Sequence, residues 1–485
     1  MKYPVPIILK GSVEEIIMEM LVIELEKSGD VPLYEQIYEQ IRVDITDGKL
    51  PVGMKLPSKR RLGEFLDVSQ TTIEFAYGQL TSEGFISSIP RKGYYVQAIE
   101  ELAYVIPTDT IDEPGKIIKE TIEIDFSPGH IDTDSFPFSQ WRKYANEVID
   151  HSSKELLLLG DPHGDIELRQ EIARYLYHSR GVNCTPQQVV VGSGTEQLMP
   201  LVIRILGKAA TYAIEDPGYP LTHHVFFHNH RDTIPVSVDE EGIDVQSLHQ
   251  STATISYVTP SHQFPTGTVL SASRRSALLN WASSHEDHFI IEDDYDSEFR
   301  YSGRPIPSLQ GMDKGDNVIY LSTFSKSLMP SLRIAYMVLP KVLLKRYEDA
   351  FIHYASTVPR LDQHILARFM ANGQFSRHLN RMRKIYRRKL QTLTEALLPY
   401  APSVSFSGDE AGMHIIVTVH TKESESKLAE IARGVGIQIY GLNKYRTTPV
   451  IEEPSFLIGF GGLSNETIKS AIDTLMNAWE IKKRQ

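Results

Sequence analysis

The chain has a single cysteine, Cys184, and no run of about 18 or more apolar residues of the kind that spans a membrane. One thiol cannot form an intrachain disulfide or a cysteine zinc site, which is typical of a protein in a reducing cytoplasm. The chain also lacks an excess of basic residues, because 50 Lys and Arg stand against 62 Asp and Glu, for a formal net charge of −12. Any contact with nucleic acid therefore needs a local basic patch.

The composition is otherwise that of a globular protein. At 485 residues, 41% hydrophobic and 23% charged, the chain is long enough for two or more domains. Residues 1–20 contain a short apolar stretch, but Glu14, Glu15 and the lack of a small-residue cleavage site argue against a signal peptide. An alternative is that translation starts at Met18 or Met20. We expect residues 1–20 to be an extension outside the folded part.

Residues 21–97 predict a compact unit of three helices and a hairpin. Apolar residues recur at helical spacing over 33–45, and Ser58 and Ser69 are suited to begin the second and third helices. The segment 86–97, ISSIPRKGYYVQ, is typical of a short β-hairpin. The pattern predicts a winged helix-turn-helix. Its expected inward-facing side chains include Leu62, Phe65, Leu66, Ile73, Ala76, Tyr77 and Leu80.

Polar and basic residues gather at three points of this unit. Basic residues at the turn into the second helix and at the hairpin tip could neutralise phosphates, and polar residues open the third helix, which faces base edges in such folds. Gln70 could pair with adenine. Acidic residues balance the basic ones here, so the alternative is a set of solvated caps and surface charges. The candidate DNA contacts are Ser58, Lys59, Arg60, Arg61, Ser69, Gln70, Thr71, Thr72, Arg91 and Lys92.

The rest of the chain has a different pattern. Residues 98–122 carry prolines and mixed charge without a clear period, which predicts an interdomain linker. From 123 to 485, apolar β-like runs alternate with helical stretches, which predicts an α/β domain with a mainly parallel sheet. The segment near 390–480 indicates a smaller α+β lobe. The chain contains no internal repeats or low-complexity tracts.

The most informative motif is STFSKSLMPSLRIAY at 322–336. A lysine that follows a strand among small hydroxyl residues suits an imine to an aldehyde cofactor, since burial can lower the pKa of its amine. Thr323, Ser325 and Arg333 could hold a phosphate, with arginine giving paired hydrogen bonds. The alternative is a surface Ser-Lys stretch without chemistry. Lys326 is therefore the candidate catalytic residue.

Two further motifs suit the same cofactor. In HFIIEDDYDSEF, Asp293 and Tyr295 share a strand face, where a buried carboxylate keeps a pyridine nitrogen protonated and a tyrosine bonds the ring oxygen. The alternative is an exposed acidic strand end; no metal is expected, because no histidine accompanies the carboxylates at suitable spacing. Gly194 and Thr195 follow a strand and could donate to a phosphate at a helix start. His262 is expected to pack or hydrogen-bond.

In this order, from about 123 to about 480, these motifs resemble the fold-type I pyridoxal-phosphate enzymes of the aspartate aminotransferase superfamily. FSPGHIDTDSFPFSQWRK, DPGYP and LIGFGGL belong to the same resemblance. The segment GKLPVGMKLPSKRRLGEFLDVSQTTIEFAYGQLTSEGFI resembles the GntR family of bacterial regulators, with Gln70 where that family usually has Arg. The fusion resembles the MocR subfamily of regulators, and within it the γ-aminobutyrate-responsive type.

The resemblance implies roles for individual residues. Lys326 forms the imine with pyridoxal 5′-phosphate, Asp293 pairs with the pyridine nitrogen and Tyr295 pairs with the phenolic oxygen. It also implies a head-to-tail, domain-swapped homodimer in the cytoplasm that binds operator DNA. The implied phosphate contacts are Gly194, Thr195, Thr323 and Arg333, to which the motif itself adds Ser325.

Three positions depart from the family pattern. Phe264 stands where many aminotransferases have Asn, so the contact to the ring oxygen is missing or supplied by Gln263. Leu221 and Lys444 stand where the γ-aminobutyrate-responsive type has arginines, and Arg446 lies close by as a substitute. Loss of a bidentate fork is not conservative, so another amino acid, an amine or pyridoxal phosphate itself stays open as effector. The candidate effector contacts are Tyr219, Lys444 and Arg446.

The sequence thus predicts a pyridoxal-phosphate-dependent, DNA-binding transcriptional regulator that senses an amino compound or the cofactor through an aminotransferase-like domain. The alternative is an active aminotransferase with an accessory DNA-binding domain, which would release keto product steadily. A third hypothesis is a DNA-binding protein whose aminotransferase fold is purely structural.

Overall fold

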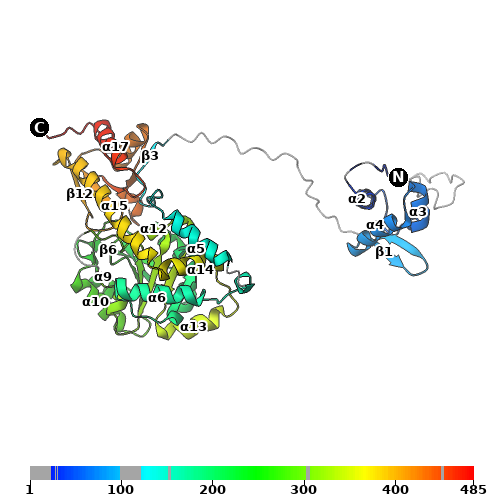
Figure 1. Ribbon diagram of the computed structural model, residues 1–485, viewed down its shortest axis with the longest axis horizontal. Helices are drawn as coiled ribbons and strands as arrows, with labels where there is room; N and C mark the ends of the chain where they lie inside the picture. Colours follow the sequence, from blue (N-terminus) through cyan, green and yellow to red (C-terminus); the bar gives the residue numbers. More distant parts are fainter. Residues whose placement is uncertain are drawn as a thin grey trace, which may run out of the picture. The chain divides into compact units, whose positions relative to one another are not determined.

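The computed structural model describes two compact units of the chain, Met1–Ile117 and Ile118–Gln485 (Figure 1). The residues it describes are 23–27, 29, 31–98, 122–150, 154–301, 306–448 and 453–484. The extension expected at 1–20, and the linker expected at 98–122 apart from its two end residues, lie outside the described residues. Among the residues that are described, no helix combines the length and the apolar character needed to cross a membrane.

The N-terminal unit is a winged helix-turn-helix, as the sequence predicts. Ser58 begins the second of its helices by accepting a hydrogen bond from the Arg61 amide at 3.3 Å, and Ser69 begins the third by accepting one from the Thr72 amide at 3.1 Å. The two strands pair antiparallel as the wing. The elements are α2 (Leu33–Thr46), α3 (Lys59–Leu66), α4 (Gln70–Ser82), β1 (Ile86–Ile89) and β2 (Gly93–Val96).

The core of this unit follows the expected faces except at Phe65. Tyr77 is fully buried, and its hydroxyl donates to Pro57 O at 3.1 Å. Phe65 is 52% exposed, so its expected inward position is wrong. The buried side of α3 includes Leu62 and Gly63. At about 100° per residue, Phe65 falls on the solvent side of that direction.

The second unit is built on an eight-stranded sheet in the order β4-β11-β10-β9-β8-β5-β6-β7. The strands from β10 through β9, β8 and β5 to β6 run parallel, whereas β11 and β7 are antiparallel to their neighbours. This confirms the mainly parallel sheet. The bounds are β4 (Val189–Gly192), β5 (Tyr212–Asp216), β6 (Thr233–Asp239), β7 (Gly242–Ile243), β8 (Ile255–Val258), β9 (Phe289–Asp294), β10 (Val318–Thr323) and β11 (Ala335–Val338).

Both faces of the sheet are covered by helices. Val189 and Val191 pack into one apolar core, whereas Val190 between them packs into another on the opposite face. On the first face α14 packs against both α5 and α6. The helices are α5 (Phe138–Asp150), α6 (Ile166–Arg180), α7 (Thr195–Leu206), α8 (Pro220–His228), α9 (Val245–Gln250), α10 (Ala272–Ser283), α11 (Leu309–Met312), α12 (Phe324–Ser327), α13 (Lys341–Phe351) and α14 (Arg360–Ala371).

The expected small lobe is an antiparallel sheet in the order β12-β13-β16-β15, with α15 and α17 packed together beside it. A separate pair joins β14 in parallel to β3, so the first described strand of this unit lies in the small lobe. The elements are β3 (Ile124–Asp125), α15 (Gln374–Leu397), β12 (Val404–Ser407), β13 (His414–Val419), α16 (Glu425–Gly434), β14 (Ile437–Gln438), β15 (Tyr440–Gly441), β16 (Ser455–Gly459) and α17 (Asn465–Ala478).

Candidate functional site

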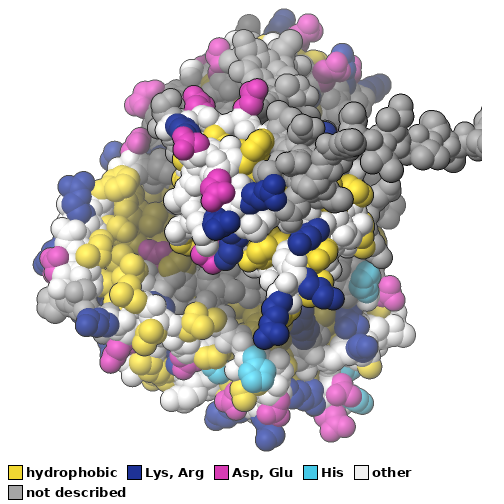
Figure 2. All heavy atoms as spheres, turned by 90° about the vertical axis from the view of Figure 1, so that its right-hand side faces the viewer, with side chains coloured by type: hydrophobic (Ala, Val, Ile, Leu, Met, Phe, Trp, Pro, Cys, Tyr) yellow, Lys and Arg dark blue, Asp and Glu magenta, His cyan; other side chains and the backbone are white. Residues whose placement is uncertain are grey.

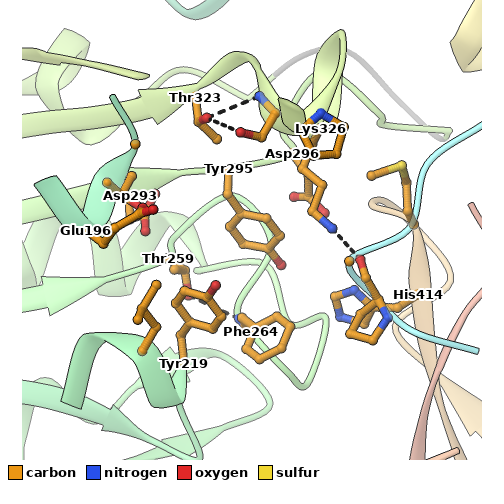
Figure 3. A pocket seen from close by; sticks show the side chains of 18 of the residues that line it. Glu196, Tyr219, Thr259, Phe264, Asp293, Tyr295, Asp296, Thr323, Lys326 and His414 are labelled. Atoms are coloured by element: carbon orange, nitrogen blue, oxygen red, sulfur yellow. Dashed lines mark hydrogen bonds between the residues drawn. The ribbon is translucent and has the colours of Figure 1, made fainter. Parts of the chain in front are cut away.

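A cavity of about 270 Å³ lies where β9 and β10 end and where α7 and α12 begin (Figure 3). In α/β folds the crevice outside the carboxyl ends of the parallel strands is where ligands bind. The cavity brings together every residue that the sequence predicts as a cofactor contact, although these residues come from separate segments of the chain. They are Gly194, Thr195, Asp293, Tyr295, Thr323, Ser325, Lys326 and Arg333.

Lys326 lies on α12, directly after β10, and its side chain reaches across the cavity. Its Nζ donates a hydrogen bond to Pro128 O. Burial lowers the pKa of Lys326 to about 8, with the nearby Asp296 carboxylate opposing the shift. An amine that loses its proton this readily is a better nucleophile near neutral pH than an ordinary lysine.

Asp293, at the end of β9, is 5% exposed. The Tyr257 hydroxyl donates to its Oδ2, while its buried Oδ1 has no hydrogen-bond partner among the described residues. Burial raises the pKa of Asp293 to about 7, and the hydrogen bond from Tyr257 opposes the rise. A buried oxygen without a donor is costly. It therefore fits a cationic N–H group in the cavity, such as a protonated pyridine nitrogen.

The opposite end of the cavity suits a phosphate. Gly194 adopts φ +109° before α7, and a Cβ there would collide with the Arg333 guanidinium and the Glu196 carboxylate. Thr323 Oγ1 accepts from the Ser325 amide at 3.1 Å and donates to Ser325 Oγ at 2.9 Å. Hydroxyls, a helix start and a guanidinium are the donors that bind phosphate.

Glu196 is a residue that sequence reasoning missed. Its carboxylate forms an ion pair with Arg333, on the rim of the same cavity. Its position next to Thr195 was the available signal, because residues in the first turn of a helix share the site at its N-terminus. A phosphate that binds Arg333 therefore competes with this carboxylate.

Aromatic rings form the wall beside Lys326. The Tyr295 hydroxyl donates to His262 O at 2.9 Å, and the Tyr219 and Phe264 rings meet edge-to-face with centroids 5.2 Å apart. Gln263 does not face the cavity. Its amide nitrogen donates to Pro217 O at 2.9 Å and to Phe264 O at 2.6 Å. Of the two alternatives for the missing Asn, a lost contact fits the structure better than a contact supplied by Gln263, because the buried loop carbonyls take the Gln263 amide hydrogens.

The predicted effector contacts divide between two hollows. Tyr219 lines the Lys326 cavity and also an adjoining hollow of about 210 Å³, whereas Lys444 and Arg446 line only the latter. The turn Leu442–Tyr445 buries Tyr445 against Phe264 and leaves the Lys444 ammonium over the Tyr440 ring, 5.5 Å from its centroid. The structure does not bring Lys444 and Arg446 into the cavity of Lys326.

The predicted DNA contacts also separate into two groups. Ser58, Ser69 and Thr72 serve the helix starts, with the Ser69 and Thr72 hydroxyl oxygens 2.8 Å apart, and Lys59 pairs with the Glu74 carboxylate. The face shown in Figure 2 carries a group of Lys and Arg side chains near its centre. Of the remaining candidates Arg61 is partly buried, whereas the exposed ones are Arg60, Gln70, Thr71, Arg91 and Lys92.

Comparison with known proteins identifies both units. Residues 33–96 match the bacterial regulatory proteins of the gntR family, and residues 121–475 match aminotransferase class I and II. The chain is 42% identical over 464 residues to the uncharacterized HTH-type transcriptional regulator YdeL of Bacillus subtilis, covering 94% of this chain and 99% of YdeL. It is 30% identical over 479 residues to the probable rhizopine catabolism regulatory protein MocR of Rhizobium meliloti, covering 94% of this chain and 95% of that protein.

The chain belongs to the MocR-type HTH transcriptional regulators. In this MocR-type regulator the GntR unit indicates DNA binding. The second unit resembles Pyrococcus horikoshii kynurenine aminotransferase, solved in complex with PMP, with a TM-score of 0.66 and 25% identity over 74% of this chain and 90% of that chain. The MocR-type regulator therefore combines a DNA-binding unit with an aminotransferase-like unit, and its relatives favour regulation over the alternative of an active aminotransferase.

Proposed function

We propose that this MocR-type regulator holds pyridoxal 5′-phosphate in the Lys326 cavity and reads an amino compound, or the cofactor itself, at that site. The observation that carries the proposal is the presence, in one cavity, of the Lys326 amine and of Asp293 Oδ1, a buried oxygen without a hydrogen-bond partner among the described residues. When bound, pyridoxal phosphate supplies an aldehyde that reacts reversibly with amines. The PMP complex of the kynurenine aminotransferase that this fold resembles supports the same cofactor class.

The residues of the cavity divide the work of binding. Lys326 would bind the aldehyde carbon through Nζ, and Asp293 would accept from the ring nitrogen through Oδ1. Tyr295, which lines the same cavity, would donate to the ring oxygen. The Tyr219 ring would cover the ligand and exclude water. The phosphate contacts are Gly194, Thr195, Thr323, Ser325 and Arg333.

The contact between Lys326 and Pro128 offers a route from the cavity to the rest of the molecule. The Nζ hydrogen bond to Pro128 O competes with the bond that Lys326 makes to a ligand. Pro128 packs against Gly459, because a Cβ on Gly459 would collide with the Pro128 backbone. An effector that frees or occupies the Lys326 amine therefore changes a contact with the small lobe. Such an effector shifts the equilibrium between two conformational states only to the extent that its affinities for the two states differ.

We also propose the boundaries and the assembly of the regulator. The DNA-binding domain spans 21–97, a linker spans 98–122 and the effector domain spans 123–485. Two chains form a domain-swapped homodimer on operator DNA in the cytoplasm. The run Leu157–Leu159, with exposed fractions of 81%, 67% and 87%, supports a protein interface on the second unit. DNA contacts come from Arg60, Arg61, Gln70, Thr71, Arg91 and Lys92 together with the helix-start residues.

The first experiment follows visible absorption while the full-length chain is titrated with pyridoxal phosphate, then reduces the complex with borohydride and maps the modified peptide. Modification of Lys326 alone, and its loss in Lys326→Gln, is the expected result. Lys444→Gln, a lysine outside the cavity, is the matched control and keeps the modification. Modification spread over surface lysines, or unchanged in Lys326→Gln, would overturn the proposal. Operator binding measured with and without candidate amines then tests sensing, and steady keto-product release would favour the aminotransferase instead.

A further inference from the structure

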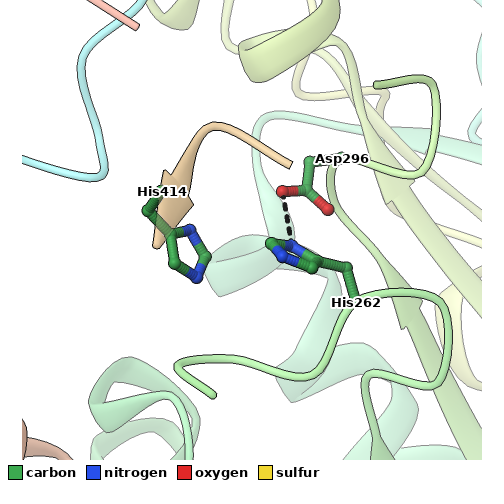
Figure 4. Close-up of side chains that lie close together, drawn as sticks. All are labelled: His262, Asp296 and His414. Carbon is green, nitrogen blue, oxygen red and sulfur yellow. Dashed lines mark hydrogen bonds and ion pairs between the residues drawn. The ribbon is translucent and has the colours of Figure 1, made fainter. Parts of the chain in front are cut away.

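A second group of functional side chains adjoins the Lys326 cavity, and two of its three members line that cavity. His262 follows β8, Asp296 follows β9 and His414 begins β13, and the three are 1%, 2% and 2% exposed. One ligand atom from each lies within 4.8 Å of the other two, and the two imidazole rings lie with centroids 4.7 Å apart and planes tilted by 42° (Figure 4). We call these three residues the His-Asp-His cluster.

Hydrogen bonds indicate which ring nitrogen each histidine offers to an ion. Nε2 of His414 lies 3.2 Å from Pro265 O, an acceptor, so Nε2 carries the hydrogen and Nδ1 keeps its lone pair. Nδ1 of His262 lies 3.0 Å from Asp296 Oδ2 and 3.0 Å from the Tyr295 hydroxyl, so a metal ion bound between Nδ1 and Oδ2 would replace the proton there. Each histidine therefore offers Nδ1 to an ion.

The cluster leaves two buried polar atoms unpaired. His262 Nε2 and Asp296 Oδ1 are buried, and neither has a hydrogen-bond partner within the described parts of the chain. Two imidazoles and a carboxylate are therefore held close together in a buried space, with one carboxylate oxygen left without a donor.

We propose that the His-Asp-His cluster binds one divalent transition-metal ion, with Zn²⁺ as the best match. Imidazole nitrogen and carboxylate oxygen are ordinary zinc ligands, and three protein ligands leave a further position open. The Pro265 carbonyl is the outer partner that orients His414, as such partners do for metal-bound histidines.

The surroundings of the cluster suit an ion. Asp296 and His414 both line the Lys326 cavity, which provides an entry path. Gly412, with φ +73°, leaves room for the His262 ring, since a Cβ at 412 would collide with it. The site stands on these ligands alone, so failure of cofactor binding at Lys326 would not remove it.

The test measures zinc retained by the full-length chain after equilibrium dialysis. The parent chain for this test carries two background substitutions, His224→Gln and His228→Gln. They remove a surface histidine pair, one turn apart on α8, whose ring centroids lie 6.3 Å apart and which could bind zinc by itself. We expect one retained Zn²⁺ per chain, and a loss of affinity of at least about tenfold in Asp296→Asn and in His414→Gln. His378→Gln, which removes a buried imidazole outside the cluster, keeps the ion.

Two outcomes would overturn the metal site. One is a parent chain that retains no zinc; the other is retention in Asp296→Asn and His414→Gln equal to that in His378→Gln. If the cluster variants fail to fold by circular dichroism, the Co²⁺ spectrum of the parent chain decides. Visible bands of a tetrahedral nitrogen and oxygen site support the proposal, and their absence refutes it.

Discussion

The hydroxyl of Tyr257 donates a hydrogen bond to Oδ2 of Asp293 and leaves Oδ1 as the oxygen available to a ligand. The two residues lie on neighbouring parallel strands, β8 and β9, so the sheet itself sets the direction of the carboxylate. A tyrosine in this position also favours the ionised form of Asp293, which is the form that pairs with a pyridinium.

Tyr257→Phe should weaken binding of pyridoxal phosphate by about tenfold, because a hydrogen bond to a charged group is removed. Absorption titration of the purified variant measures the change. Tyr212→Phe is the matched control, since Tyr212 is also buried in the sheet but its hydroxyl has no partner among the described residues. Equal affinities of the two variants would contradict this role of Tyr257.

Asp293 and Asp294 are adjacent carboxylates that should respond differently to replacement by Asn. Asp294 accepts from Arg180 Nε at 2.7 Å and from the Tyr320 hydroxyl at 2.5 Å, and all three are buried. Asp294→Asn should lower the free energy of unfolding by about 3 kcal/mol, because it leaves the Arg180 charge buried and unpaired. Asp293→Asn should weaken cofactor binding with a much smaller loss of stability. Urea unfolding followed by circular dichroism compares the stability of the two variants. An equal loss of stability in both would contradict the separate roles of Asp293 and Asp294.

The capture of pyridoxal phosphate by Lys326 should depend on pH with a midpoint near 8. The neutral amine reacts, so the rate rises with pH while the ammonium form predominates and levels off above the pKa of about 8. An ordinary lysine would continue to gain rate toward its pKa of 10.5. Stopped-flow absorption measures the profile, with N-acetyl-lysine as the control for ionisation of the cofactor. A rate still rising steeply above pH 9 would contradict the shift.

Substitutions in the winged helix should distinguish residues that contact phosphates from residues that contact bases. Arg91→Ala and Lys92→Ala should weaken binding to all sequences alike and each reduce the slope of log K against log salt by about one. Gln70→Ala should cost about 1–3 kcal/mol on the preferred operator and relax its sequence preference. Fluorescence anisotropy at several salt concentrations measures both. Lys49→Ala is the control, because the Lys49 ammonium pairs with Asp44 at 3.0 Å. If Lys49→Ala changed the salt slope as much as Lys92→Ala does, the assignment of Lys92 as a phosphate contact would be contradicted.

Much of the site could be predicted from the sequence because its contacts sit in short motifs at strand ends. Lys326 follows β10, and Asp293 is the last residue but one of β9, so strand and turn signals alone brought them to one edge of the sheet. The order of the strands, in which β9 and β10 are neighbours, could not be predicted from the local pattern.

Other contacts could not be predicted because they depend on packing between distant segments. His414 joins His262 and Asp296 only through the approach of the small lobe to the large sheet, which no local spacing encodes. The same holds for Lys444, whose short turn leads it into the adjoining hollow, away from Lys326. The inward position predicted for Phe65 was wrong because an eight-residue helix has too few apolar residues to show which of its faces is buried.

The pairing of β3 with β14 has a mechanical consequence. The peptide that follows the DNA-binding unit enters the second unit through β3, and β3 is held by the small lobe, with Phe126 hydrogen-bonded to both Gln438 and Gly459. The tether is therefore anchored to the lobe that also carries His414, and not to the large sheet. A rotation of that lobe would therefore carry with it the point at which the chain from the DNA-binding unit joins the second unit.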